Sequence, residues 1–188
     1  MAHAALSSLF PSICISFDEI DYKTGVIVNA IDKPLPISRE DFLERWNHWY
    51  AEHPGVIYRK SGGVRTVVQI SDFLSEREFS ETAFYNEFWQ FLGIRHQLSA
   101  IIPLPDRIVA VSANRDSAFT ERESKLMELL QPHFAQAYQI LRSIDPEAHG
   151  ASDVEGSESR KQVPAWGDLE VVDGLWKGST ITGKLWRS

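Results

Sequence analysis

The chain has 188 residues, of which 43% are hydrophobic, and it carries a formal net charge of −7 at pH 7. This length can bury a substantial core as one globular domain with some residues to spare. The acidic balance excludes the clustered Lys and Arg that contacts with nucleic-acid phosphates require. We therefore expect no direct nucleic-acid contact by this chain.

Signals for targeting, disulfides and metals are absent from the sequence. No apolar run approaches the length of a membrane span, and the first residues lack the basic start and long apolar core of a signal peptide, so we expect a cytoplasmic protein without membrane contact. The single cysteine, Cys14, excludes an internal disulfide, and no Cys and His set has zinc spacing. We expect no metal and no cofactor, with a tetrapyrrole attached to Cys14 as the remaining alternative.

An alternating segment near the start predicts a strand with one buried face. Its apolar residues Ile13, Ile15 and Phe17 alternate with Cys14, Ser16 and Asp18. Lys23, Thr24 and Gly25 then supply a turn, and residues 26–28 return as a second strand. The pair is predicted to form a hairpin.

The middle of the chain is predicted to be mainly helical. Ser38 and Asp41 have the spacing of a helix start, and the run His53-Pro54-Gly55 is expected to end that helix. Residues 56–58 and 66–70 are predicted to be short extended segments. Asp72 is expected to cap a short helix, and Gly93 is expected to end the next one in a left-handed conformation.

The clearest signals lie between residues 95 and 141. Two apolar segments meet at Pro105-Asp106, a pair that favours a turn, so residues 95–115 are predicted to form an antiparallel hairpin. Thr120 and Glu123 have the spacing of a capping box at the start of a long amphipathic helix. Pro132 predicts a bend in this helix rather than its end. The apolar stripe that must be buried consists of Leu126, Leu130, Phe134, Ala137 and Leu141.

This order of elements predicts the α+β class, with an antiparallel sheet flanked by helices and a long C-terminal helix. We assign residues 1–144 to one domain. Residues 145–159 contain five acidic residues and no Lys or Arg, which is typical of a linker. Residues 145–188 are therefore predicted to be an acidic linker followed by an atypical, poorly ordered tail.

Three segments of the chain have a recognisable sequence pattern: residues 71–79 (SDFLSEREF), residues 92–98 (LGIRHQL) and residues 119–138, with the run LQPHFAQA. Together they resemble the GAF-like sensory domain at the N-terminus of LuxR-type transcriptional regulators. The resemblance covers roughly Ser8 to Ile144. It implies a GAF- or PAS-like domain without catalytic chemistry, whose terminal helix passes a signal to a helix-turn-helix. No glycine turn or basic recognition helix follows Phe119, so a complete DNA-reading module is not expected here.

Aromatic and polar side chains that would converge between sheet and helices are the candidate ligand-binding residues. Together they would supply the apolar wall and the few polar groups of a small-molecule site. The alternative is that they are core aromatics with satisfied polar tips. Arg115 is expected to pair with Glu121 or Asp116, or else to bind an anionic ligand. The candidates are Trp46, Tyr58, Tyr85, Trp89 and His96.

No catalytic triad, phosphate-binding loop or dinucleotide fingerprint is present, so we predict that the protein is not an enzyme. We expect a sensory domain that binds a small ligand or a partner and signals through the helix from Thr120 to Leu141. Exposed Met127, Tyr138 or Ile140 would make this helix the interface of a homodimer. The alternative is an interaction or structural remnant whose pocket is filled by its own side chains.

Overall fold

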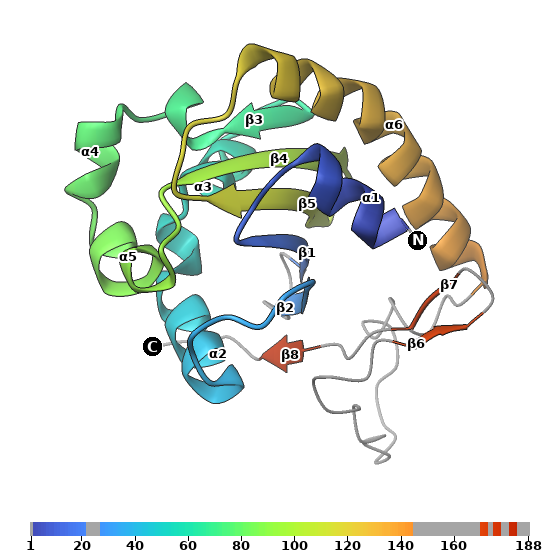
Figure 1. The fold of residues 1–188 in the computed structure, drawn as a ribbon, viewed down its shortest axis with the longest axis horizontal. Helices are drawn as coiled ribbons and strands as arrows, with labels where there is room; N and C mark the ends of the chain where they lie inside the picture. Colours follow the sequence, from blue (N-terminus) through green and yellow to red (C-terminus); the bar gives the residue numbers. More distant parts are fainter. Residues whose placement is uncertain (1, 22–26, 145–169, 173–174, 178–180, 184–188) are drawn as a thin grey trace.

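The computed structural model of the chain describes residues 2–21, 27–144, 170–172, 175–177 and 181–183. Its centre is an antiparallel sheet in the order β3-β4-β5-β1-β2-β8 (Figure 1). The α+β class and the antiparallel sheet that the sequence predicts are confirmed. The strands of this sheet are β1 (Cys14–Asp21), β2 (Ile27–Ile31), β3 (Val67–Gln69), β4 (His96–Pro103), β5 (Arg107–Arg115) and β8 (Ile181–Gly183).

Helices and short helical turns connect these strands. The described helices are α1 (Ala2–Leu9), α2 (Arg39–Trp49), α3 (Pro54–Lys60), α4 (Glu76–Ser80), α5 (Gln90–Leu92) and α6 (Glu121–Ile144). Shorter turns span Tyr50–Glu52 and Ile70–Asp72, and a π-helical turn spans Tyr85–Trp89. None of the helices in the described ranges combines the length and the hydropathy of a membrane span.

Both predicted hairpins are present, and they meet in the middle of the sheet. β1 pairs with β2, β4 pairs with β5, and β5 also pairs with β1, all antiparallel. The predicted turn at residues 23–25 lies outside the described residues. The turn at Pro105-Asp106 joins β4 to β5 as expected.

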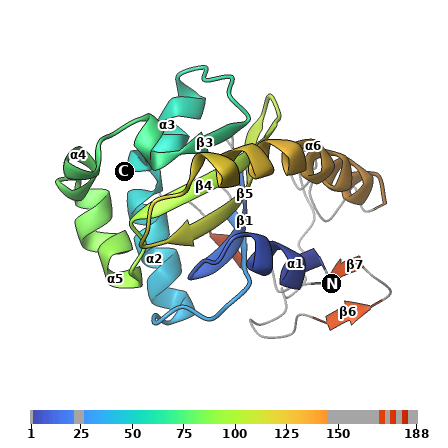
Figure 2. The same cartoon turned by 45° about the horizontal axis from the view of Figure 1, so that its top comes forward.

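α6 covers one face of the sheet together with α1 (Figures 1 and 2). The Thr120 backbone amide donates to Glu123 Oε2 over 2.7 Å, and the Glu123 amide donates to Thr120 Oγ1 over 3.2 Å, so the predicted capping box is confirmed. The helix continues through Pro132. Met127 and Tyr138 are buried against the sheet, so the expectation that they are exposed was wrong.

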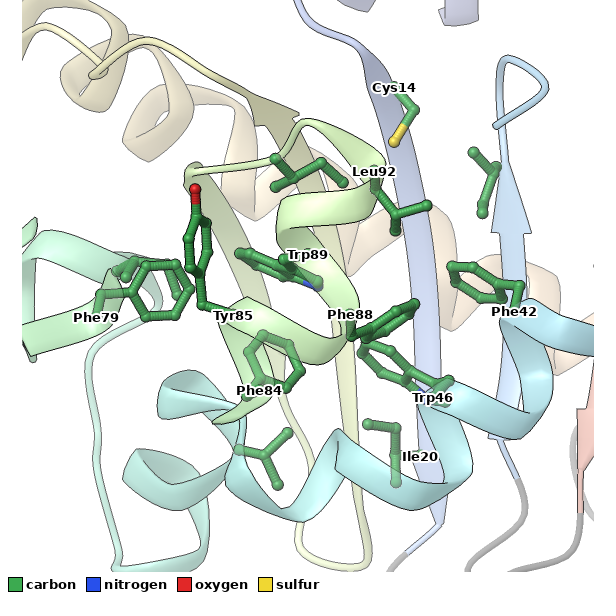
Figure 3. Packing of buried hydrophobic residues seen from close by; sticks show 14 of the residues in the cluster. Cys14, Ile20, Phe42, Trp46, Phe79, Phe84, Tyr85, Phe88, Trp89 and Leu92 are labelled. Carbon is green, nitrogen blue, oxygen red and sulfur yellow. The ribbon is translucent and has the colours of Figure 1, made fainter. Parts of the chain in front are cut away.

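The opposite face is covered by α2, α3, α5 and the turn Tyr85–Trp89, which bring a cluster of aromatic side chains onto it. Phe42 and Trp46 project from α2 toward Phe88 and Trp89 above β1 (Figure 3). Because helices cover both faces, β1 is buried on both sides. The prediction of a half-buried β1 was therefore wrong, and the polar residues expected to face solvent are inside the protein.

Residues 56–58, which were predicted to be extended, belong instead to the helix α3. His53 caps this helix, because its Nδ1 accepts a hydrogen bond from the Gly55 amide over 3.0 Å. Pro54 occupies the first turn, where a missing amide proton costs nothing. The His-Pro-Gly run thus ends one helical segment and begins the next, whereas only the first role is predicted from the sequence.

Two other local predictions hold. Ser38 accepts from the Asp41 amide over 3.1 Å, and Gly93 ends α5 with a φ of 72°, in the left-handed region. Asp72 accepts from the Gln69 amide over 2.7 Å at the start of the turn Ile70–Asp72. The expectation that it caps the helix that follows was wrong, because Ser75 caps α4.

Most of the predicted linker and tail lies outside the described residues. Of this segment, β6 (Glu170–Val172) pairs with β7 (Leu175–Lys177), and β8 pairs with the outer edge of β2. The domain boundary after residue 144 stays a prediction.

Candidate functional site

Two small cavities lie between the sheet and the aromatic cluster. Their volumes are about 30 and 40 Å³, whereas a single water needs about 10–15 Å³ and a ligand site usually has about 300–1,000 Å³. Asp18, Trp46 and Gln97 line both of them. In this conformation the space is therefore filled largely by side chains of the protein.

Hydrogen bonds link buried polar side chains from four strands into one network along the floor of the first cavity. Gln97 Nε2 donates to Asn114 Oδ1 over 2.9 Å, and Asn114 Nδ2 donates to Ser16 Oγ over 3.3 Å. Ser16 Oγ donates to Asp18 Oδ2 over 2.9 Å, and Asn29 Nδ2 donates to Asp18 Oδ1. We call these five residues the polar chain: Gln97, Asn114, Ser16, Asp18 and Asn29.

Strand register explains why these residues meet. Asp18 lies opposite Asn29 in the β1–β2 pair, and Gln97 lies opposite Asn114 in the β4–β5 pair. Residues directly opposite in an antiparallel pair project on the same side, here toward the helices. The sequence thus places a polar residue at matching positions of neighbouring strands.

Asp18 is the acidic member of the polar chain. Burial raises the pKa of Asp18 to about 6, although the hydrogen bonds from Ser16 and Asn29 act in the opposite direction. The side chain therefore titrates near neutral pH. It is ionised at pH 7.5 and largely protonated at pH 5.

His53 lines the second cavity and is held among aromatic rings. Its ring centroid lies 5.2 Å from that of Phe84 and 5.1 Å from that of Trp89, both with edge-to-face geometry. Burial lowers the pKa of His53 to about 4, although a hydrogen bond with Gln97 opposes this shift. The imidazole is therefore neutral at pH 7 and contributes no charge to the cavity.

Trp46 is one of two residues lining the first cavity that have a buried polar atom without a hydrogen-bond partner among the described residues. It is 7% exposed, and no described residue accepts a hydrogen bond from its Nε1. Asn29 Oδ1 is likewise buried without a donor among the described residues. An unpaired buried polar group costs about 1–3 kcal/mol, and in a cavity wall it marks a position where a ligand atom would be stabilised.

The structure brings together some of the residues that the sequence suggested. Trp46 lines both cavities and Trp89 lines the first. Tyr58 lies beside Phe73 and accepts a hydrogen bond from the Arg65 amide, outside both cavities.

The remaining two candidates also lie outside the two cavities. Tyr85 packs in the aromatic cluster against Phe79, with ring centroids 5.2 Å apart. His96 lies beside Glu76 at 3.3 Å and opposite Arg115 in the β4–β5 register. Whether any of the five candidates contacts a ligand stays a prediction.

The polar chain and His53 were not among the candidate residues. A usable signal was present, because β1, β4 and β5 each carry two polar residues at alternate positions: Ser16 and Asp18, Gln97 and Ser99, and Ser112 and Asn114. If helices cover both faces of a sheet, such residues must be buried and hydrogen-bonded to one another.

Neither Arg115 nor Cys14 shows the features of a reactive or ligand-binding group. Arg115 donates to both carboxylate oxygens of Glu123, at 2.7 and 2.9 Å, so the expected partners Glu121 and Asp116 were wrong. Burial raises the pKa of the Cys14 thiol to about 12, which keeps it protonated.

Within the described ranges, no group of three or more His, Cys, Asp or Glu is placed to hold a metal ion.

The lining chemistry suits an uncharged molecule. The described residues around the two cavities include no Lys or Arg, and they combine aromatic and aliphatic walls with amide, hydroxyl and indole groups. An anionic ligand would have no counter-charge and would face the Asp18 carboxylate. A neutral molecule with one acceptor and one donor could form hydrogen bonds with the polar groups of the lining residues, accepting from Trp46 and donating to Asn29 or Asp18.

Comparisons with known proteins place this fold. No protein-family model matches the sequence, and the search of curated proteins gives no match. The chain is similar to the LBD domain of VqsR from Pseudomonas aeruginosa, with a TM-score of 0.60 and 17% identity over 73% of this chain and 82% of that one. It is also similar to SdiA in complex with octanoyl-rac-glycerol, with a TM-score of 0.55 and 14% identity over 83% of this chain and 62% of that chain.

A third similarity is to CepR2 from Burkholderia cenocepacia, an N-acylhomoserine-lactone-dependent LuxR-family transcription factor. Its TM-score is 0.46, with 16% identity over 76% of this chain and 83% of that one. The first two similarities show that the chain shares its fold with the LBD domain of VqsR and with SdiA. The expected resemblance to LuxR-type sensory domains is confirmed at the level of the fold, while its GAF-like label stays a prediction.

Proposed function

We propose that this chain is a non-enzymatic, cytoplasmic sensory domain that binds a neutral amphipathic small molecule between its sheet and the aromatic cluster. The observation that carries the proposal is Trp46, which lines both cavities and whose buried indole Nε1 lacks an acceptor among the described residues. The polar chain beneath it adds donors and acceptors that would fix the orientation of a ligand. The similarity to SdiA, which was solved with octanoyl-rac-glycerol, supports a ligand of this chemical character.

Binding requires the two cavities to merge and enlarge. Trp46 lies at the border between them, so a change in its position would join the spaces. A ligand that binds the enlarged state would shift the population toward it. We propose that α6 transmits this change to a partner domain or to a second copy of the chain.

A thermal-shift experiment tests the ligand site. We expect octanoyl-rac-glycerol, an uncharged probe, to raise the Tm of the full chain, and octanoate at the same concentration to leave it unchanged. Trp46→Phe removes the indole donor and should weaken binding by about fivefold, since one hydrogen bond contributes about 1 kcal/mol.

Trp49→Phe is the matched control, because Trp49 is half-buried on the same helix and lines neither cavity. It should bind the probe as the unmodified chain does. Equal losses in the two variants would contradict the assignment of Trp46 as a ligand donor.

A second candidate function is an interaction module with a permanently filled pocket. The cavity volumes of about 30 and 40 Å³ favour it, because they hold no more than a few waters. In that case no uncharged amphipathic probe raises the Tm, and Trp46→Phe has no effect on any binding measurement.

A further inference from the structure

We propose that β1 couples the cavities to the second half of α6, through Asp18 on one side of the strand and Glu19 on the other. This inference rests on the proposed ligand site, since it names the route by which occupancy would reach the helix. Asp18 lines both cavities. Glu19 is 5% exposed on the opposite face, which α6 covers.

The contact between Glu19 and α6 is a buried polar cluster. Arg107 Nη1 donates to Glu19 Oε1 over 2.6 Å, and Arg107 Nη2 donates to Asp106 Oδ2 over 2.6 Å. Burial raises the pKa of Tyr138, and the charge of the adjacent Glu19 carboxylate raises it further. We call this cluster the Glu19 clamp: Glu19, Arg107, Asp106 and Tyr138.

The clamp depends on an accurate position of β1. Buried charges are stable only while their partners keep good geometry, so small displacements of Glu19 change its electrostatic interaction with Tyr138. The Phe17 ring also contacts α6, with its centroid 6.2 Å from that of Tyr138. Because neighbouring strand residues project to opposite faces, a backbone shift at Asp18 moves Phe17 and Glu19 together.

The two halves of α6 differ in their relation to the cavities. In the second half, Gln131 Nε2 donates to the carbonyl of Ile101 over 2.8 Å, and Ile101 lines the second cavity. In the first half, Glu123 is held by Arg115 and Thr120, and none of these three residues lines a cavity. Coupling is therefore expected in residues 131–144 and not in residues 121–130.

Hydrogen–deuterium exchange of the full chain, without any ligand, tests this route. Asp18→Asn changes the cavity side of β1 by removing one of the two accepted hydrogen bonds. We expect it to raise the exchange rate of amides in residues 133–144 by about threefold while residues 121–130 keep theirs. Ser112→Ala is the matched control. Ser112 is also a buried polar residue that lines a cavity, but it lies on β5 rather than β1 and is not part of the clamp, so exchange in residues 133–144 should stay unchanged.

The decisive variant is Tyr138→Phe, which removes the hydroxyl at the clamp. In that background Asp18→Asn should cause no further change in residues 133–144. Three results with Asp18→Asn would overturn the proposal. They are unchanged exchange in residues 133–144 when Tyr138 is present, an equal change there with and without the Tyr138 hydroxyl, and an even change along the whole of α6. If Asp18→Asn does not fold, Asn29→Ser removes the donor to Asp18 instead and gives the same comparison.

The outcome separates this inference from the ligand proposal. Binding of octanoyl-rac-glycerol together with unchanged exchange in residues 133–144 would overturn the coupling and leave the ligand site intact. Selective exchange changes without any probe binding would support the coupling and contradict the ligand site.

Discussion

Buried polar residues are the most informative single positions in this protein. The five members of the polar chain are each no more than 8% exposed, although an apolar face at the same positions would pack against the helices without desolvating polar groups. Hydrogen bonds within the chain offset part of that cost. Together with the Trp46 indole, which lacks an acceptor among the described residues, they are the observations on which the proposed ligand site rests.

Asp18 should make stability depend on pH. Its folded-state pKa of about 6 lies above the ordinary 3.8, so its contribution to stability is present at low pH and is lost as pH rises through 6. Relative to Asp18→Asn, the unmodified chain should gain about 1 kcal/mol of unfolding free energy between pH 7.5 and pH 5. Urea unfolding at the two pH values measures this difference, and parallel behaviour of the two chains would refute it.

His53 should act in the opposite direction. Its folded-state pKa of about 4 lies below the ordinary 6.5, so its contribution is present above pH 6.5 and is lost as pH falls toward 4. Relative to His53→Gln, the unmodified chain should lose about 2 kcal/mol between pH 7.5 and pH 5. The same urea series measures it, and a gain in place of a loss would show that His53 is not held neutral by burial.

Among the elements, those with local signals could be predicted from the sequence. The start of α6 depends on Thr120 and Glu123, which are three residues apart and bond to each other. By contrast, β1 is buried on both sides only because α2 and the turn Tyr85–Trp89 pack over it. The start of α3 was missed because His53 and Pro54, which begin it, also follow the end of the preceding helical turn. These features depend on distant parts of the chain.

The site was harder to predict than the fold for the same reason. Asn114 and Ser16 are 98 residues apart in sequence, yet they share a hydrogen bond. The aromatic candidates Trp46 and Trp89 could be recognised by residue type, because large aromatic side chains commonly line ligand sites. A polar residue in a strand gives no such signal until the partner strands and the covering helices are known.

Pro132 should be a source of instability within α6. It lies inside a continuous helix and is exposed, so its ring contributes no buried contact while it removes one backbone donor. Pro132→Ala should therefore raise the unfolding free energy by about 1–3 kcal/mol, as measured by urea denaturation. His133→Ala, at the exposed neighbouring position, is the control and should change it by less than about 0.5 kcal/mol.

A Pro132→Ala variant that is less stable than the unmodified chain would contradict this prediction. It would show that the bend expected at Pro132 is needed to bring two side chains of α6, Gln131 and Tyr138, into their buried positions against the sheet. The gain in helix stability would then be smaller than the loss of packing.

At the scale of the whole molecule, α6 has one face on the sheet and an outer face with exposed apolar residues. Leu129, Ile140 and Ile144 are 70%, 50% and 65% exposed, and Leu129 and Ile140 lie about three helical turns apart on the same side. Burial of Met127 and Tyr138 removes them from this surface, so the self-association predicted from the sequence depends on Ile140 and these neighbours. A symmetric dimer would bury the stripe against itself.

Light scattering on the full chain at high micromolar concentration tests this arrangement. We expect a dimer for the unmodified chain and a monomer for Ile140→Glu, because burying a carboxylate in an apolar helix interface is unfavourable. Ile57→Glu is the matched control, since Ile57 is 53% exposed on α3, a different helix, and it should leave the dimer intact. A monomeric unmodified chain would refute the dimer, and a dimer that persists in Ile140→Glu would place the interface on another surface.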